Sequence, residues 1–182
     1  MYNAMYVFAK VHLIGHACVG FGNNNGPQII FNQDGADGSG PSFGNAYAPL
    51  WRFGWEQAKN HFIVGEDIYH GYVVTNGKVS DAFDYANGIF EGSPDRPKKD
   101  RNIVRNRISN ILNQNCATFT KDVAQKCGIN TFVPGAFAPL DVFNAMGRAD
   151  ILYGDVSQWG VLRRENGRVT FAKKWGAIPQ LN

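Results

Sequence analysis

The alternation of apolar and polar residues over 11–21 predicts a β-strand. In VHLIGHACVGF the odd positions are apolar or small, whereas the even positions include two histidines and a cysteine. A dense turn signal, GNNNGP, follows at 22–27, and QIIFNQ at 28–33 has the composition of a second short strand. The two segments therefore predict an antiparallel hairpin.

The register of this hairpin decides which polar residue lies beside His16. Residues directly opposite each other share a face, so apolar residues should pair with apolar residues. Pairing Val19 with Ile29 satisfies this rule and sets His16 opposite Asn32. Sliding the strands by two residues sets it opposite Asp34 instead. Either register gives His16 a polar neighbour on its own face.

A helical spacing of apolar residues predicts a helix over 116–127. Its expected buried stripe consists of Phe119, Val123 and Cys127. Gly128 is the expected left-handed stop. Because the polar run NQN precedes the helix and is suited to cap it, Cys116 falls in the first turn.

The remaining pattern predicts a mixed chain without an internal repeat or a domain boundary, so we expect a single domain over 1–182. The further elements expected are a glycine-rich loop at 34–49, strands at 61–67 and 68–75, a helix at 78–90, a loop and short helix within 133–148, and a C-terminal hairpin turning at 165–167.

Composition narrows the class of protein. With 44% hydrophobic and 18% charged residues, the chain of 182 residues is typical of a folded domain. Its net charge of +3 is too small to indicate nucleic-acid binding. No apolar run approaches the roughly 20 residues of a membrane helix. The opening residues lack the basic head and separate apolar core of a signal peptide, so we expect synthesis in the cytoplasm without one.

Basic residues gather in SPDRPKKDRNIVRNR at 93–107. This run is interpreted as a solvated loop leading into a helix, and the alternative is a binding patch for an acidic partner.

The three cysteines are Cys18, Cys116 and Cys127. An odd count without paired spacing argues against a disulfide framework, and no C-x-x-C or H-x-x-x-H spacing suggests zinc. We expect neither a metal nor an organic cofactor. Cys127 belongs to the apolar stripe, and Cys18 is expected to pack near His16.

Cys116 is the candidate nucleophile. A thiol reacts well only as a thiolate, and a helix N-terminus and a nearby imidazolium both lower its pKa. His16 could supply the imidazolium, with Asn32 or Asp34 orienting its ring. The free N–H of Cys116 could donate to an oxyanion, and the preceding Gln114 and Asn115 are candidates for the oxyanion site or cleft.

Two segments carry a family resemblance. GHACVGFG and NQNCATFTKDVAQKCGI resemble the signature blocks of the circularly permuted papain-like (NlpC/P60-related) cysteine hydrolases, in which the histidine strand precedes the cysteine helix. The likeness covers roughly 10–145 and leaves a C-terminal extension at 146–182. It implies an α+β fold of the permuted papain-like (NlpC/P60) type, an antiparallel sheet packed against helices, with Cys116 as nucleophile and His16 as base.

The same resemblance implies a thiol hydrolase acting on an amide bond, a peptidase or amidase. The glycine-rich loops and the short N-C-A-T-F block look most like the bacterial toxin and effector branch. That branch implies export by a specialised secretion system, a cell-wall peptide or a protein side-chain amide as substrate, and a cognate immunity or inhibitor protein as partner.

Two alternatives stay open. Acyl transfer and glutamine deamidation use the same dyad. A non-catalytic binding protein would keep the scaffold and recognise a partner through Trp51, Phe53, Trp55 and the loop at 34–49.

Overall fold

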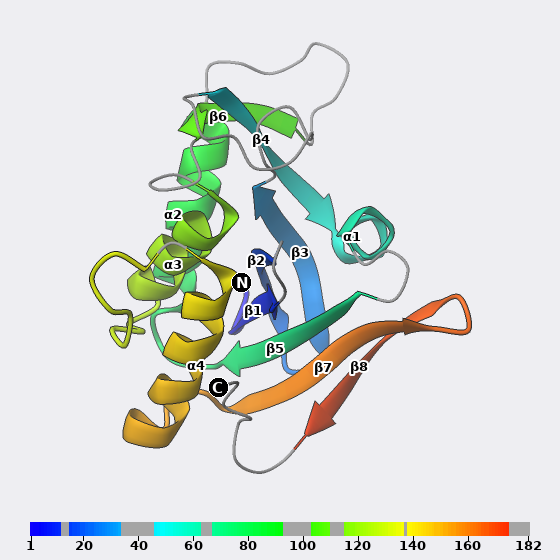
Figure 1. Cartoon of the computed structure of the whole chain (residues 1–182), viewed down its shortest axis with the longest axis vertical. Coiled ribbons are helices and arrows are strands. Elements are labelled where there is room, and N and C mark those ends of the chain that lie inside the picture. The colour runs from blue at the N-terminus through cyan, green and yellow to red at the C-terminus, as the bar shows by residue number, and fades with distance from the viewer. Residues whose placement is uncertain are drawn as a thin grey trace.

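The fold is α+β, with one curled antiparallel sheet and helices on both of its faces (Figure 1). The computed structural model describes residues 1–11, 15–33, 46–62, 67–92, 103–109, 115–136 and 138–174.

The eight strands of the sheet follow the order β6-β4-β3-β2-β1-β5-β7-β8, and every neighbouring pair is antiparallel. Their bounds are β1 Ala4–Lys10, β2 His16–Asn23, β3 Gly26–Gln33, β4 Ala46–Gly54, β5 Ile68–Val74, β6 Ile103–Ser109, β7 Gln158–Glu165 and β8 Arg168–Lys174.

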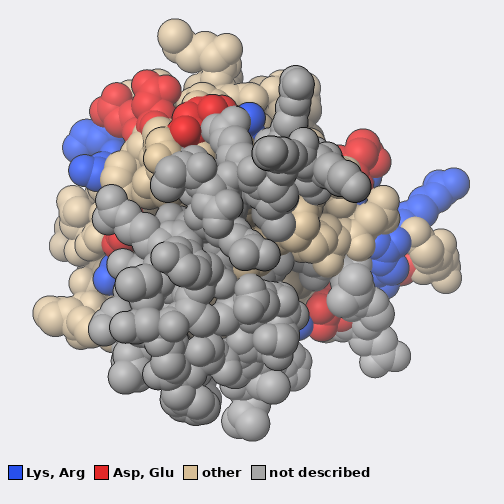
Figure 2. All heavy atoms as spheres, turned by 90° about the horizontal axis from the view of Figure 1, so that it is seen from above, with Lys and Arg blue, Asp and Glu red and all other residues tan. Residues whose placement is uncertain are grey.

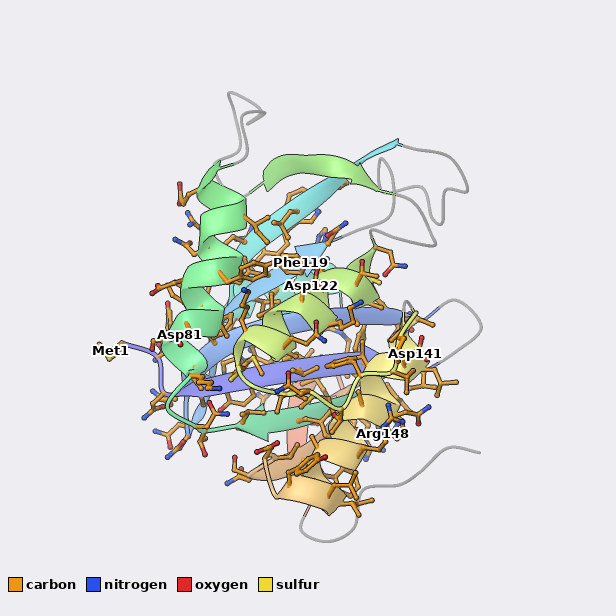
Figure 3. The ribbon with its side chains drawn as sticks, turned by 90° about the vertical axis from the view of Figure 1, so that its left-hand side faces the viewer. Met1, Asp81, Phe119, Asp122, Asp141 and Arg148 are labelled. Atoms are coloured by element: carbon orange, nitrogen blue, oxygen red, sulfur yellow. The ribbon has the colours of Figure 1, made fainter. Side chains whose placement is uncertain are left out.

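The described helices are α1 Trp55–Phe62, α2 Val79–Gly92, α3 Cys116–Lys126 and α4 Pro139–Tyr153. Helices α2, α3 and α4 cover one face of the sheet, as Figure 3 shows from the helical side, and α1 lies on the opposite side (Figure 1).

Two hydrophobic cores follow from side-chain alternation in the strands. The larger core lies under α2, α3 and α4 and takes the odd residues of β2, such as Val19 and Phe21. The smaller core lies on the α1 side and takes Cys18 from β2, Ile30 from β3 and Tyr69 from β5. Because both faces are covered, the central strands are buried on both sides.

The predicted hairpin of 11–21 with 28–33 is confirmed as the pairing of β2 with β3, although β2 begins only at His16, and its register is the second of the two that the sequence allowed. Val19 pairs with Phe31, and Phe21 pairs with Ile29. This is the register that slides by two residues. It keeps apolar opposite apolar as well as the expected one does, so the sequence rule could not separate them. Asp34 lies outside the described residues.

Several other expectations need correction. Ala4–Lys10 is a strand that the pattern did not predict, and Ala46–Gly54 begins within the expected loop at 34–49. Residues 61 and 62 end helix α1 instead of opening a strand. Part of the basic run forms strand β6, which pairs with β4 and does not lead into a helix as a loop.

The cysteine helix agrees with its prediction. Its buried residues include Phe119 and Val123, Cys127 is fully buried, and Gly128 adopts a left-handed φ of 92° at the stop. Helix α4, with 15 residues, is longer than the short helix expected.

The predicted C-terminal hairpin is present and extends the sheet. It turns at Asn166 and Gly167, whose φ values of 49° and 76° suit a tight two-residue turn. Strand β7 pairs with β5, and Trp159 joins the larger core with 8% exposure.

Charged side chains of both signs lie interspersed among the described atoms of the face shown in Figure 2. The side chains of the basic run at 93–107 are outside the described set, so the alternative of a binding patch for an acidic partner stays a prediction. No described helix is long and apolar enough to cross a membrane.

Candidate active site

Asn115 holds the start of helix α3. Its side-chain oxygen accepts hydrogen bonds from the N–H groups of Ala117 at 2.8 Å and Thr118 at 3.0 Å. In return, the Asn115 N–H donates to the Thr118 hydroxyl at 2.7 Å, which completes a capping box. The cap fixes Cys116 as the first residue of the helix.

Gly15 fixes the start of strand β2. A Cβ at this position would lie 2.5 Å from the carbonyl oxygen of Lys10 and 3.0 Å from the side chain of Pro139. Only a residue without a side chain fits such a close approach of β1 and α4. The glycine before the histidine therefore lets α4 begin directly beside the residue that precedes His16.

Asn32 orients the His16 ring. The Nε2 atom of His16 is hydrogen-bonded to the side-chain oxygen Oδ1 of Asn32. An amide oxygen only accepts, so Nε2 carries the proton and Nδ1 is the basic nitrogen of the neutral ring. The two residues come from neighbouring strands in the shifted register, which makes their contact diagonal.

The second partner of His16 is Cys116. Burial alone would raise the pKa of the half-buried Cys116 thiol, yet that pKa lies below its ordinary value. The charge of His16 and a hydrogen bond to its side chain lower it, as do backbone hydrogen bonds from Ala17 and Ala117. His16 thus stabilises the thiolate, which is the reactive form.

The three residues meet at the end of the sheet. By alternation, His16 and Asn32 share the face of Cys18 and Ile30, whereas α3 packs on the other face. Because His16 is the first residue of β2, its ring can contact groups that arrive from both sides. The thiol, imidazole and amide therefore form a Cys-His-Asn arrangement without sharing one sheet face.

The N–H of Cys116 suits an oxyanion. The cap engages the next two N–H groups of α3, and no described residue accepts the N–H of Cys116. A donor at a helix N-terminus beside the sulfur can stabilise negative charge on a carbonyl oxygen that the sulfur attacks.

Asn115 and Gln114 were the other residues predicted for the oxyanion site or cleft. The side-chain oxygen of Asn115 is engaged in the cap, so its amide oxygen positions the helix. Gln114, like Asp34, lies outside the described residues.

Two neighbours of His16, Lys10 and Tyr69, were not predicted from the sequence. Lys10 pairs directly with His16 in the β1–β2 register, and its ammonium forms a 3.0 Å ion pair with Asp67. Tyr69 presents its ring at 85° to the imidazole, with 6.4 Å between centroids. Predicting β1 from its continuous apolar run would have exposed Lys10 as the residue opposite His16.

Trp51, expected on a recognition surface, lies directly opposite Asn32 in the β3–β4 register. Its ring stacks on Phe53 with centroids 5.0 Å apart, and the ring of His61 lies 4.9 Å from it. The half-buried indole therefore borders the residue that orients His16.

The other two thiols are poorly placed for chemistry. Cys18 is fully buried in the smaller core. Burial raises the pKa of the Cys127 thiol to about 12, and its sulfur donates to Asn76 Oδ1 at 3.4 Å. Cys116 is therefore the thiol of the chain that combines partial exposure with a lowered pKa.

Nothing among known protein families, curated proteins or solved structures matches this chain. The chemistry of the site rests on its own residues. Within the described parts of the chain, no three His, Cys, Asp or Glu side chains are grouped as metal ligands would be.

Proposed function

We propose that this protein is a cysteine-dependent hydrolase of amide bonds, a peptidase or amidase with Cys116 as nucleophile, His16 as base and Asn32 as the orienting residue. The observation that carries the proposal is the chain of contacts at the start of α3: the half-buried Cys116 thiol is hydrogen-bonded to the His16 side chain, and His16 is hydrogen-bonded to the side-chain oxygen of Asn32. The resemblance of the two signature segments to the permuted papain-like hydrolases supports the same assignment.

The reaction follows from the protonation states. The Cys116 thiolate attacks the amide carbonyl carbon, and the carbonyl oxygen, which becomes negatively charged, accepts a hydrogen bond from the Cys116 N–H. The protonated His16 then gives its proton to the leaving amine as the C–N bond breaks, which leaves a thioester. Neutral His16 takes a proton from water, the resulting hydroxide attacks the thioester, and the thiolate and imidazolium are restored.

The test combines substrate panels with isotope labelling. Native protein, Cys116→Ala and Cys116→Ser would be incubated in ¹⁸O-water with bacterial cell-wall peptides and with glutamine-containing proteins, and the products analysed by mass spectrometry. We expect ¹⁸O in a new carboxylate with native protein alone. Equal products from native protein and Cys116→Ala would overturn the proposal.

The same experiment separates the related reactions of the dyad. Peptide cleavage releases an amine-ended fragment, deamidation releases ammonia from a glutamine side chain, and acyl transfer joins the acyl group to an added amine without ¹⁸O. All three pass through the thioester at Cys116, which can be trapped and located by mass spectrometry after acid quenching.

The setting proposed with this chemistry is that of a bacterial toxin or effector restrained by an inhibitor protein. The likeness of the N-C-A-T-F block to that branch supports it. Expression of native protein and Cys116→Ala in bacteria, retained in the cytoplasm or directed to the periplasm, tests this setting. Growth arrest by native protein alone, in one compartment, is expected, and equal growth in all four cultures contradicts it.

A further inference from the structure

Lys10 and Asp67 form an ion pair next to His16 that the reaction above does not use. The Lys10 ammonium lies 3.0 Å from the Asp67 carboxylate, and the two side chains are 19% and 25% exposed. Both belong to segments that flank the site, since Lys10 ends β1 and Asp67 directly precedes β5. An ion pair in this position contributes to the field at the imidazole.

The sheet sets Lys10 beside His16. The two residues are direct partners in the antiparallel β1–β2 pairing, so their side chains leave the same face as neighbours. The Tyr69 ring lies close to both side chains. The Lys10 ammonium is 5.9 Å from the Tyr69 ring centroid, and the centroid of the His16 ring is 6.4 Å from it. Because Tyr69 is only 1% exposed, little water can enter between them from its side.

The charged and titratable groups around His16 come from several elements. They are Cys116 from α3, Lys10 from β1 with its partner Asp67, and Tyr69 from β5. Strand β3 contributes the neutral Asn32. Among these groups, Lys10 is the cation paired with His16 across the strands.

We propose that the Lys10–Asp67 ion pair tunes the base of the site: the ammonium opposes protonation of His16, the carboxylate offsets the ammonium, and together they set the pH at which the imidazolium loses its proton. A positive charge disfavours a second one nearby, and a partly buried position weakens the screening by water. Lys10 thus acts on the reaction through the charge that it places beside His16. This inference rests on His16 being the base of the proposed reaction.

The experiment separates this inference from the proposed function by removing the thiol. In Cys116→Ser, His16 titrates without a thiolate partner, and its ring signals are followed by NMR over a pH series after assignment with His16→Gln. Adding Lys10→Met should raise the titration midpoint of His16 by about half a pH unit. Adding Asp67→Asn should lower it by a similar amount, because the Lys10 charge is then uncompensated.

Two controls define the effect. Lys59 forms an ion pair with Glu56 at 2.7 Å and lies 5.7 Å over the ring of Trp55, on α1, away from His16 in the sequence of the sheet. Lys59→Met should leave the titration of His16 unchanged. Raising the salt concentration to about 1 M, where the Debye length is about 3 Å, should shrink both shifts, since a through-space interaction is screened.

Opposite shifts for the two variants support the inference, whatever the reactivity of Cys116 proves to be. Shifts of the same sign, or none, overturn it. Lys10→Gln provides a second neutral variant if Lys10→Met does not fold. In the protein with its thiol, Lys10→Met should also move the alkaline limb of iodoacetate labelling of Cys116 to higher pH, because the imidazolium attracts this anionic reagent.

Discussion

At the scale of single residues, His16 is the residue on which the site depends. One ring nitrogen binds the Asn32 amide, and the ring stabilises the Cys116 thiolate. The sequence predicted Cys116 and His16 and a polar neighbour for His16, because alternation and helix capping are local signals, but it left Asn32 and Asp34 open as that neighbour. It could not predict that the contact with Asn32 is diagonal, since both registers paired apolar residues equally well.

Replacing Asn32 should reduce the fraction of Cys116 that is present as thiolate without abolishing it. Asn32→Ala frees the His16 ring to rotate, so we expect the pKa of Cys116 to rise and its alkylation near pH 6 to slow about tenfold. Asn32→Asp should keep the fast reaction, because a carboxylate also accepts from Nε2–H. Mass spectrometry after timed iodoacetamide labelling measures both rates, and unreacted Cys127 reports that the protein stayed folded. Unchanged labelling of Asn32→Ala would show that Asn32 does not orient the ring.

Lys10 shows why part of the site is invisible in the sequence. Residues 4–9 are all buried, because β1 lies between two covered faces, so the strand has no apolar and polar alternation. Without that strand there is no register, and without a register nothing indicates that Lys10 lies opposite His16. The ion pair with Asp67 depends on the pairing of β1 with β5, two strands that are distant in sequence.

At the scale of elements, the start of helix α3 should affect both the stability of the helix and the reactivity proposed for Cys116. The Asn115 cap satisfies two N–H groups and holds Cys116 at the positive end of the helix. Caps and stop glycines are local, which explains why this helix was predicted closely from its sequence. Strands β4 and β6 were missed, because turn-rich and basic residues there outweigh the local strand signal.

Two variants at Asn115 distinguish the effect of losing the helix cap from the effect of adding a negative charge beside Cys116. Asn115→Ala should lower the free energy of unfolding by about 1 kcal/mol, because the cap is lost. Asn115→Asp should keep the cap and the stability, but its carboxylate next to the sulfur should raise the pKa of Cys116 and slow its alkylation. Urea unfolding and labelling rates measure the two effects. Equal labelling of Asn115→Asp and native protein would contradict the placement of the cap beside the thiol.

The end of the same helix should make folding sensitive to high pH. Burial raises the pKa of Cys127 from its ordinary value of 9.0 to about 12, and the protonated thiol donates to Asn76. Between these values the unfolded chain loses the proton that the folded protein keeps, so stability falls as pH rises, by about 1.4 kcal/mol per unit. Cys127→Ala removes this contribution.

The difference in unfolding free energy between native protein and Cys127→Ala should therefore decline steadily above pH 9 in urea titrations. A constant difference up to pH 11 would show that the thiol is not buried in its protonated form.

At the scale of the whole molecule, the last hairpin belongs to the main fold. Strand β7 pairs with β5, and Trp159 packs into the core that also holds α2, α3 and α4. The sequence predicted the hairpin from its Glu-Asn-Gly turn, but not its place beside β5. Strand order depends on pairings between distant segments, for which a single sequence carries no local signal.

This packing predicts one cooperative unfolding transition. Trp159→Ala should lower the free energy of unfolding by about 3–5 kcal/mol, because it removes a large buried side chain. Far-ultraviolet circular dichroism and the accessibility of Cys127 should report the same midpoint in native protein and in the variant. Separate midpoints would indicate that the C-terminal hairpin unfolds independently.

The central claim is that His16 makes Cys116 a thiolate. The most direct test is the pH dependence of alkylation at each cysteine, followed by mass spectrometry in native protein and in His16→Ala. We predict that Cys116 alone reacts quickly near pH 6 in native protein and that His16→Ala abolishes this reaction. If Cys116 reacts no faster than a denatured thiol in both proteins, the dyad does not exist and the enzymatic account is wrong.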